Sequence, residues 1–199
     1  MVDRNSGGKE IAADKDQKKG ISALLLIDVI SDFEFEDGEK LYANAQEAAA
    51  SLAALKGKVT AAGMPVIYIN DNYGKWQEDF NAQVDRIIGS TARGRDIASL
   101  LKPGPDDYYV LKPQRSGFYE TPLDVLLASL KVTDLIVTGF STDICVLFTA
   151  HDAYMRGYKV RVPADCCAAV EPAYHDSAIE LIGRVAKADT GDSTEIQFE

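Results

Sequence analysis

Three side chains that can act in acid, base or nucleophilic chemistry stand at or near the ends of predicted strands. Asp28 lies near the end of the apolar run ISALLLIDVI, Lys112 ends the run YYVLK, and Cys145 follows the run LIVTGF. Position 145 falls in the first turn of the helix predicted after this last strand, where unpaired backbone N–H groups and the helix dipole favour a thiolate. Cys145 is therefore either a nucleophile or a small buried hydrophobic residue.

The elements that must position these side chains alternate between strands and helices. Strands are predicted at about residues 22–30, 65–70, 108–111, 135–139 and 159–162, with a short sixth strand near the chain end as an option. Helices are predicted at about residues 40–62, from 121, from 145 to 156 and at 174–185, with one or two more within 72–101. This alternation predicts a three-layer α/β/α sandwich of Rossmann-like type, with a mostly parallel sheet of five or six strands. Because the carboxyl ends of parallel strands meet at one edge, we expect Asp28, Lys112 and Cys145 to converge.

The segments around these three residues resemble a known family. Asp28 in LLLIDVISDF, Lys112 in VLKPQRSGFY and Cys145 in VTGFSTDICVLFTAHDAYMRGY are similar to the isochorismatase-like cysteine hydrolases, which include nicotinamidases and N-carbamoylsarcosine amidohydrolases. The resemblance runs from about residue 21 to residue 187. It implies a catalytic triad of Asp, Lys and Cys, and a cis peptide bond before the nucleophile, here between Phe140 and Ser141.

The three residues have separate expected roles. Asp28 is expected to accept the thiol proton as general base and to return it to the leaving amine, while the cation of Lys112 stabilises the thiolate. Backbone N–H groups of Ser141 and Cys145 are expected to bind the oxyanion, and water then hydrolyses the thioester. A Cys–His pair is disfavoured, because His151 lies on a different helix face from Cys145 and nothing in the sequence points to His175.

The chain contains two histidines, and this scarcity bears on metal binding. Nicotinamidases usually hold a metal after the second strand through an Asp and histidines in a DxH-like pattern, whereas here MPVIYIN is followed by Asp71, Asn72, Tyr73 and Gly74. The nitrogen ligands that zinc prefers are missing from this segment. We therefore predict no metal and no other cofactor, and we disfavour nicotinamidase activity. A cysteine at position 145 also favours C–N hydrolysis over isochorismatase-type cleavage of a vinyl ether.

Composition limits the partners and the compartment. A chain of 199 residues with 46% hydrophobic content suits one hydrolase domain, at about 21–199, after a polar, mobile tail at about 1–20. A net charge of −10 argues against nucleic acid or an anionic membrane as partner. The sequence has neither an apolar run of about 18 residues nor a signal peptide, and the adjacent Cys166 and Cys167 disfavour a mutual disulfide. A cytoplasmic location is expected.

The substrate pocket is harder to predict than the triad. Phe33, Trp76 and Phe118 are candidates to contact a small planar substrate, although core or interface packing suits each of them as well. Arginines that could bind a substrate carboxylate, or simply lie at the surface, are Arg93, Arg95 and Arg115. A homo-oligomer, either a dimer or a tetramer, is expected to form through the aromatic stretch at 72–80.

The leading hypothesis is a metal-independent cysteine hydrolase that cleaves the C–N bond of a small amide or carbamoyl compound. Isochorismatase-type or nicotinamidase activity is an alternative within the same family. A non-catalytic ligand-binding or oligomerising protein on the same scaffold is a rival. A thiol redox protein that pairs Cys145 with Cys166 or Cys167 is another.

Overall fold

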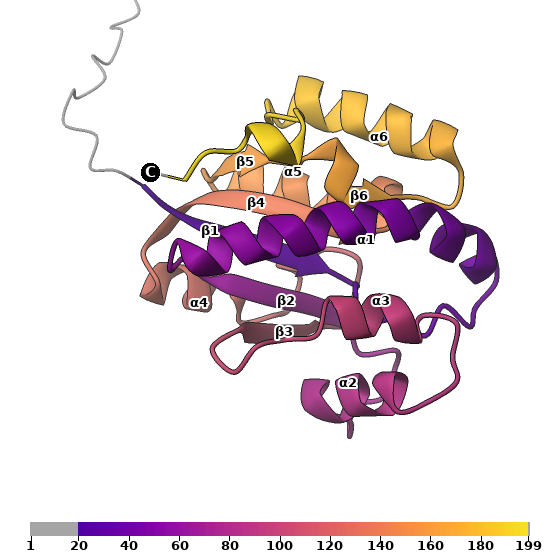
Figure 1. The fold of residues 1–199 in the computed structure, drawn as a ribbon. Helices are drawn as coiled ribbons and strands as arrows, with labels where there is room; N and C mark the ends of the chain where they lie inside the picture. The colour runs from indigo at the N-terminus through magenta and orange to yellow at the C-terminus, as the bar shows by residue number, and fades with distance from the viewer. Residues whose placement is uncertain (1–19, 199) are drawn as a thin grey trace, which may run out of the picture.

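The computed structural model describes residues 20–198, so the predicted tail lies outside the described residues except for Gly20. A six-stranded sheet forms the centre, with the order β3-β2-β1-β4-β5 and with β6 beside β4 (Figure 1). Its strands are β1 (Ile21–Ile27), β2 (Val66–Asp71), β3 (Tyr108–Lys112), β4 (Val132–Phe140), β5 (Lys159–Arg161) and β6 (Cys167–Ala168). All neighbouring strands are parallel. The predicted α/β class and parallel sheet are confirmed.

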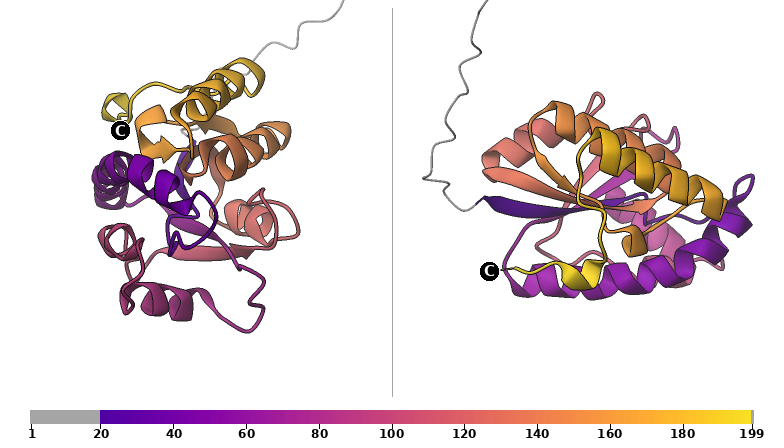
Figure 2. Two further views of the ribbon diagram at one scale, coloured as in Figure 1. Left: turned by 90° about the vertical axis from the view of Figure 1, so that its right-hand side faces the viewer. Right: turned by 90° about the horizontal axis from the view of Figure 1, so that it is seen from above.

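Helices cover both faces of this sheet, as two views at right angles show (Figure 2). One face packs against α1 (Gly38–Ala61), α2 (Phe80–Ile88) and α3 (Arg95–Leu100). The other face packs against α4 (Leu123–Ser129), α5 (Leu147–Met155) and α6 (Pro172–Val185). Short turns of helix complete the described chain: η1 (Thr142–Val146), η2 (Ala164–Cys166) and η3 (Ser193–Glu195). Within residues 20–198, no helix is both long enough and apolar enough to cross a bilayer.

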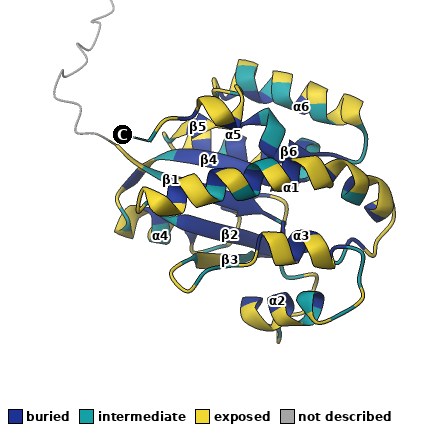
Figure 3. Ribbon diagram, viewed as in Figure 1, coloured by how far each residue is buried: buried dark blue, intermediate teal, exposed yellow. Residues whose placement is uncertain are grey.

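The strands are buried on both sides, which explains their continuous apolar sequence. In β1, Leu24 and Leu26 belong to the core under α1, while Leu25 and Ile27 belong to the core on the opposite face. The strands of the sheet are accordingly coloured as buried, whereas the helices expose their outer faces (Figure 3). A strand with one face in water would instead alternate apolar and polar residues.

Three elements differ from the sequence-based prediction. The strand expected at 22–30 ends at Ile27, because Asp28 adopts a left-handed conformation with φ of 52° and turns the chain out of the sheet. The sixth strand is β6, which precedes α6 rather than following it, and the chain end contributes only an isolated bridge between Arg161 and Asp189. The helix after β4 begins with a π-helical turn, η1, and becomes α-helical at Leu147.

The sheet has a topological switch point between β1 and β4, because the chain adds β2 and β3 on one side of β1 and then β4 on the other. Ligands of open α/β sheets bind outside the carboxyl ends of the strands at such a point. The two strands approach closely there. Gly139 has a φ of 116°, and a Cβ built on it would lie 2.1 Å from the carbonyl oxygen of Ile27. Strand β4 can therefore reach this position beside β1 only with glycine.

Replacing Gly139 with alanine should lower the free energy of unfolding by at least about 2 kcal/mol, because the added methyl group meets backbone and the conformation is strained for an L-residue. Urea denaturation measures this. Gly57→Ala is the matched control: Gly57 lies in α1 and a Cβ there meets nothing within 4 Å. That substitution should raise the stability by about 0.5–1 kcal/mol. A Gly139→Ala protein as stable as the wild type would contradict the close approach of β1 and β4.

Candidate active site

Asp28 follows the last residue of β1 and is held in place by backbone contacts. Its N–H donates to the carbonyl of Ile69 at 2.9 Å, and its Oδ1 accepts from the N–H of Asp71 at 2.7 Å. The side chain is 12% exposed. The loop that follows is fixed by Asn70, a fully buried residue whose amide exchanges two hydrogen bonds with the backbone of Ile30. The carboxylate is therefore presented in one orientation at the strand end.

Lys112 ends β3 and extends across the end of β2 toward β1. Neighbouring strands are about 4.8 Å apart, so a group two strands away is reached only by a long side chain. The ammonium Nζ lies 2.8 Å from Oδ2 of Asp28 and 3.5 Å from the carboxylate of Asp71. Its side chain is completely buried. A buried cation needs paired negative charges, and these carboxylates supply them.

Cys145 lies in η1, the π-helical turn that follows β4. Its Sγ is 3.5 Å from Nζ of Lys112, and the charge of Asp28 raises the pKa of the thiol. The peptide bond between Phe140 and Ser141, at the end of β4, is cis. The hydroxyl of Ser141 donates to the carboxylate of Asp143 and makes no capping hydrogen bond to the turn. The structure therefore brings together Asp28, Lys112 and Cys145, which are far apart in the sequence.

The protonation states of these groups follow from burial and from their mutual charges. Burial raises the pKa of Asp28 above its ordinary value of 3.8, against the opposing effect of the lysine cation. Burial disfavours the cation of Lys112, yet the negative charge of Asp28 raises its pKa above 10.5. Burial and then the charge of Asp28 raise the pKa of the Cys145 thiol well above 9.0. These effects favour the protonated thiol, against the opposing effect of the Lys112 cation, and they suit the expected role of Asp28 as acceptor of the thiol proton.

A cavity of about 600 Å³ opens onto this group, with Asp28, Ser141 and Cys145 in its wall. Phe33, Phe140 and other apolar side chains line part of the wall, while charged side chains line the rest. This volume lies in the range of small-molecule sites. Ser141 and Cys145 both border the cavity. That their backbone N–H groups bind the oxyanion stays a prediction.

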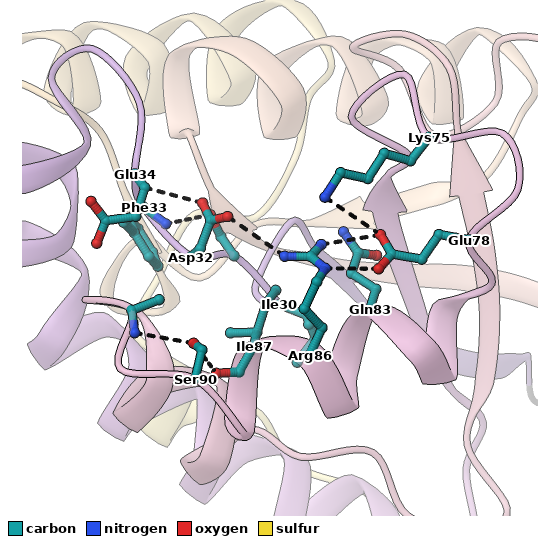
Figure 4. Close-up of polar contacts among 12 residues, drawn as sticks. Ile30, Asp32, Phe33, Glu34, Lys75, Glu78, Gln83, Arg86, Ile87 and Ser90 are labelled. Carbon is teal, nitrogen blue, oxygen red and sulfur yellow. Dashed lines mark hydrogen bonds and ion pairs between the residues drawn. The ribbon is translucent and has the colours of Figure 1, made fainter.

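Charged residues from α2 and two loops form a network (Figure 4), of which Asp32, Lys75 and Arg86 line the cavity. Arg86 donates from Nε and Nη2 to the two carboxylate oxygens of Glu78, at 2.7 and 3.1 Å, and its Nη1 lies 3.8 Å from Asp32. Lys75 lies 3.9 Å from Glu78. Because Arg86 is already shared between two carboxylates, it ties α2 to the loop that follows β1.

The structure places one of the three predicted aromatic residues at the cavity. Phe33 is in its wall but is completely buried, with a φ of 55° and its carbonyl bound by Nη1 of Arg93 at 2.7 Å. Trp76 is 78% exposed and is not among the described residues that line the cavity. Phe118 packs into the core on the other face of the sheet, stacked on Tyr158 with the guanidinium of Arg156 over its ring. Trp76 and Phe118 are thus corrected as pocket residues, and the oligomer contact at 72–80 stays a prediction.

The three arginines that were candidates to bind a substrate carboxylate make other contacts. Arg95 donates to the carbonyl of Ile88, and Arg115 lies over the ring of Phe148. Neither these two nor Arg93 is among the described residues lining the cavity, whereas Arg86 is. The sequence contained no motif that distinguishes Arg86 from the other arginines. Asn70 could have been recognised from the sequence as a residue that fixes the site, because a polar amide near the end of an apolar strand needs hydrogen-bond partners.

The segment after β2, where nicotinamidases were expected to hold a metal, carries a different set of side chains. Tyr73 and Lys75 border the cavity beside Asp71, and the carboxylate of Asp71 accepts the N–H of Tyr73 while lying 3.5 Å from Lys112. Within residues 20–198, no three His, Cys, Asp or Glu side chains are grouped so that they could share a metal ion. A phenol and an ammonium group do not fit a zinc site.

The fold and the site define a class of protein: a parallel α/β domain with a cysteine, an aspartate and a lysine at the switch point of the sheet. A family model for the isochorismatase domain matches residues 22–191, and the chain belongs to this family. It is 40% identical over 172 residues to the uncharacterized isochorismatase family protein YaaI of Bacillus subtilis (strain 168), covering 86% of this chain and 93% of that protein. It is 28% identical to a streptothricin hydrolase of Streptomyces noursei, covering 88% of this chain and 68% of that enzyme.

Solved structures agree with this assignment. The N-carbamoylsarcosine amidase of Thermoplasma acidophilum superimposes with a TM-score of 0.68 and 27% identity, covering 89% of this chain and 99% of that chain. An isochorismatase family protein from Desulfovibrio vulgaris superimposes with a TM-score of 0.71 and 25% identity, over 88% and 96% of the two chains. The predicted family resemblance is confirmed.

Asp28→Asn should make Cys145 more reactive toward iodoacetamide at neutral pH, although it removes the base. The negative charge of Asp28 raises the pKa of the thiol, so its removal increases the thiolate fraction. A shift of one pKa unit changes that fraction about tenfold, and the lower nucleophilicity of a more acidic thiol offsets part of the gain. We expect alkylation to accelerate about threefold to tenfold, measured by peptide mass spectrometry.

Asp32→Asn is the matched control, because Asp32 lines the same cavity but pairs with Arg86. The rate at which Cys145 is alkylated in the Asp32→Asn variant should stay within about twofold of the wild-type rate. Cys166 and Cys167 serve as internal references, since both are buried. Slower alkylation of Cys145 in the Asp28→Asn variant would contradict the charge arrangement described here.

Proposed function

We propose that the protein is a cysteine hydrolase that cleaves the C–N bond of a small amide or carbamoyl compound, with Cys145 as nucleophile. The observation that carries the proposal is the position of Lys112, whose ammonium contacts Asp28 at 2.8 Å and Cys145 at 3.5 Å. A carboxylate and a thiol in the wall of a cavity, with a buried cation in contact with both, form an activated nucleophile.

The reaction divides into an acylation and a hydrolysis step. Asp28 accepts the thiol proton as Sγ attacks the substrate carbonyl carbon, and the lysine cation stabilises the thiolate as it forms. The raised pKa of Asp28 suits it to hold this proton and then to transfer it to the departing nitrogen as the C–N bond breaks. Asp28 next removes a proton from water, which attacks the thioester carbon. The acid leaves, and the thiol regains its proton from Asp28.

The substrate class is supported by the relatives and by the cavity. A streptothricin hydrolase and an N-carbamoylsarcosine amidase are both similar to the chain over most of its length. Phe35, which is 46% exposed and lies in the cavity wall, supplies an apolar surface for the body of a small substrate. We also propose that the backbone N–H groups of Ser141 and Cys145 stabilise the oxyanion, which in comparable sites contributes about 10²- to 10³-fold in rate.

Cys145→Ala should abolish hydrolysis while leaving the fold intact, because the thiol forms the covalent bond and contributes little to the core. A panel of small amides, lactams and carbamoyl amines, assayed for release of ammonia or amine, identifies a substrate for this test. Circular dichroism checks the fold.

Cys166→Ala is the control for this test, since Cys166 is a buried thiol outside the cavity wall. It should keep most of the activity. Substantial turnover by Cys145→Ala would overturn the proposed mechanism, as would equal losses in the two variants.

A further inference from the structure

The turn that carries the nucleophile is held from outside the catalytic cavity by a histidine on α6. The hydroxyl Oγ1 of Thr142 lies 2.9 Å from Nδ1 of His175, in a hydrogen bond between residues 33 positions apart. Thr142 is completely buried and is the first residue of η1. His175 stands in the first turn of α6, and α6 packs against η1.

Apart from the contact of Cys145 with Lys112, the other polar contacts of this turn come from nearby in the sequence. The carbonyl of Ser141 accepts the N–H groups of Ile144 and Val146, and the hydroxyl of Thr149 donates to the carbonyl of Cys145 at 2.7 Å. These contacts shape the turn but do not place it relative to the rest of the molecule. The contact with His175 does, because it joins the beginning of the turn to a separate helix.

Neither Thr142 nor His175 is among the described residues that line the catalytic cavity. His175 instead borders a second cavity of about 430 Å³, together with Asn44, Glu47 and Cys167. His175 therefore lies outside the wall of the cavity proposed for the substrate. This position excludes direct contact with the reacting atoms but suits a group that supports the turn from behind.

We propose that His175 is a positioning residue: through its hydrogen bond to Thr142, it fixes the turn that holds Cys145 and the proposed oxyanion N–H groups. The inference rests on the proposed function, in which Cys145 is the nucleophile. Small displacements of a reacting group are costly in rate, since catalysis depends on the geometry of the nucleophile and the oxyanion donors. Loss of the bond should thus lower kcat more than it changes KM.

The experiment compares two substitutions of the same residue. His175→Leu removes the hydrogen bond, whereas His175→Asn keeps an amide group close to the position of Nδ1. For His175→Leu we expect amide hydrogen exchange at residues 141–146 to become about fivefold faster, the effect of losing one ordinary hydrogen bond. We expect kcat to fall by at least about fivefold with KM within about twofold. His175→Asn should restore both properties in large part.

Thr142→Val tests the partner of this bond. It should reproduce the effects of His175→Leu, and the double variant should be no worse than either single variant, because all three lack the same interaction. His151→Leu is the control, since His151 bonds the carbonyl of Leu147 within its own helix. It should leave exchange in the turn and kcat unchanged.

Hydrogen exchange needs no substrate, so it separates this inference from the proposed function. Unchanged exchange at 141–146 in His175→Leu would overturn the positioning role, whatever the activity of Cys145→Ala. Uniformly faster exchange across the sheet, or no rescue by His175→Asn, would also overturn it, because either result indicates a general structural role. Conversely, local exchange that depends on His175 in a protein whose activity survives Cys145→Ala would reject the proposed function alone.

Discussion

The buried cation of Lys112 is the constraint on which the rest of the site depends. Its side chain is completely buried, and its ammonium contacts the carboxylates of Asp28 and Asp71 and the sulfur of Cys145. A buried charge that loses its partner costs about 3–5 kcal/mol, so the ends of β1, β2 and β3 must stay in register for the cation to remain paired. The interaction that stabilises the strand ends thereby also sets the distance between the proposed base and the nucleophile.

The close approach of β1 and β4 completes this arrangement. Lys112 and Asp28 belong to one side of the switch point, whereas Cys145 arrives from the other side on β4 and η1. Glycine at position 139 allows the backbones to come together, and the π-helical turn then directs the thiol toward the carboxylate. Single π-helical turns occur often at functional sites, where they change the direction of a side chain. The backbone geometry of β4 and η1 and the charge of Lys112 therefore both determine where Cys145 lies relative to Asp28.

The triad could be predicted from the sequence because each member lies at or shortly after the end of a strand and parallel strands share one carboxyl edge. Phe118 could not be placed, since it follows β3 by several loop residues and a loop does not reveal the face on which a side chain lies. Arg86 was missed for a related reason: its position at the cavity depends on where α2 docks after an irregular segment. The raised pKa of Cys145 could not be predicted, because it depends on how deeply the thiol is buried and on its distance from the charge of Asp28.

The most direct test of the central claim is to detect the acyl group on Cys145. A substrate found in the amide panel is mixed with the protein, the reaction is quenched in acid within milliseconds to seconds, and the intact mass and peptide map are recorded. We expect a transient mass increase equal to the acyl group, located on the peptide that contains Cys145 and removed by hydroxylamine. Turnover without any adduct under conditions where acylation outpaces hydrolysis, or an adduct on another residue, would contradict a mechanism through Cys145.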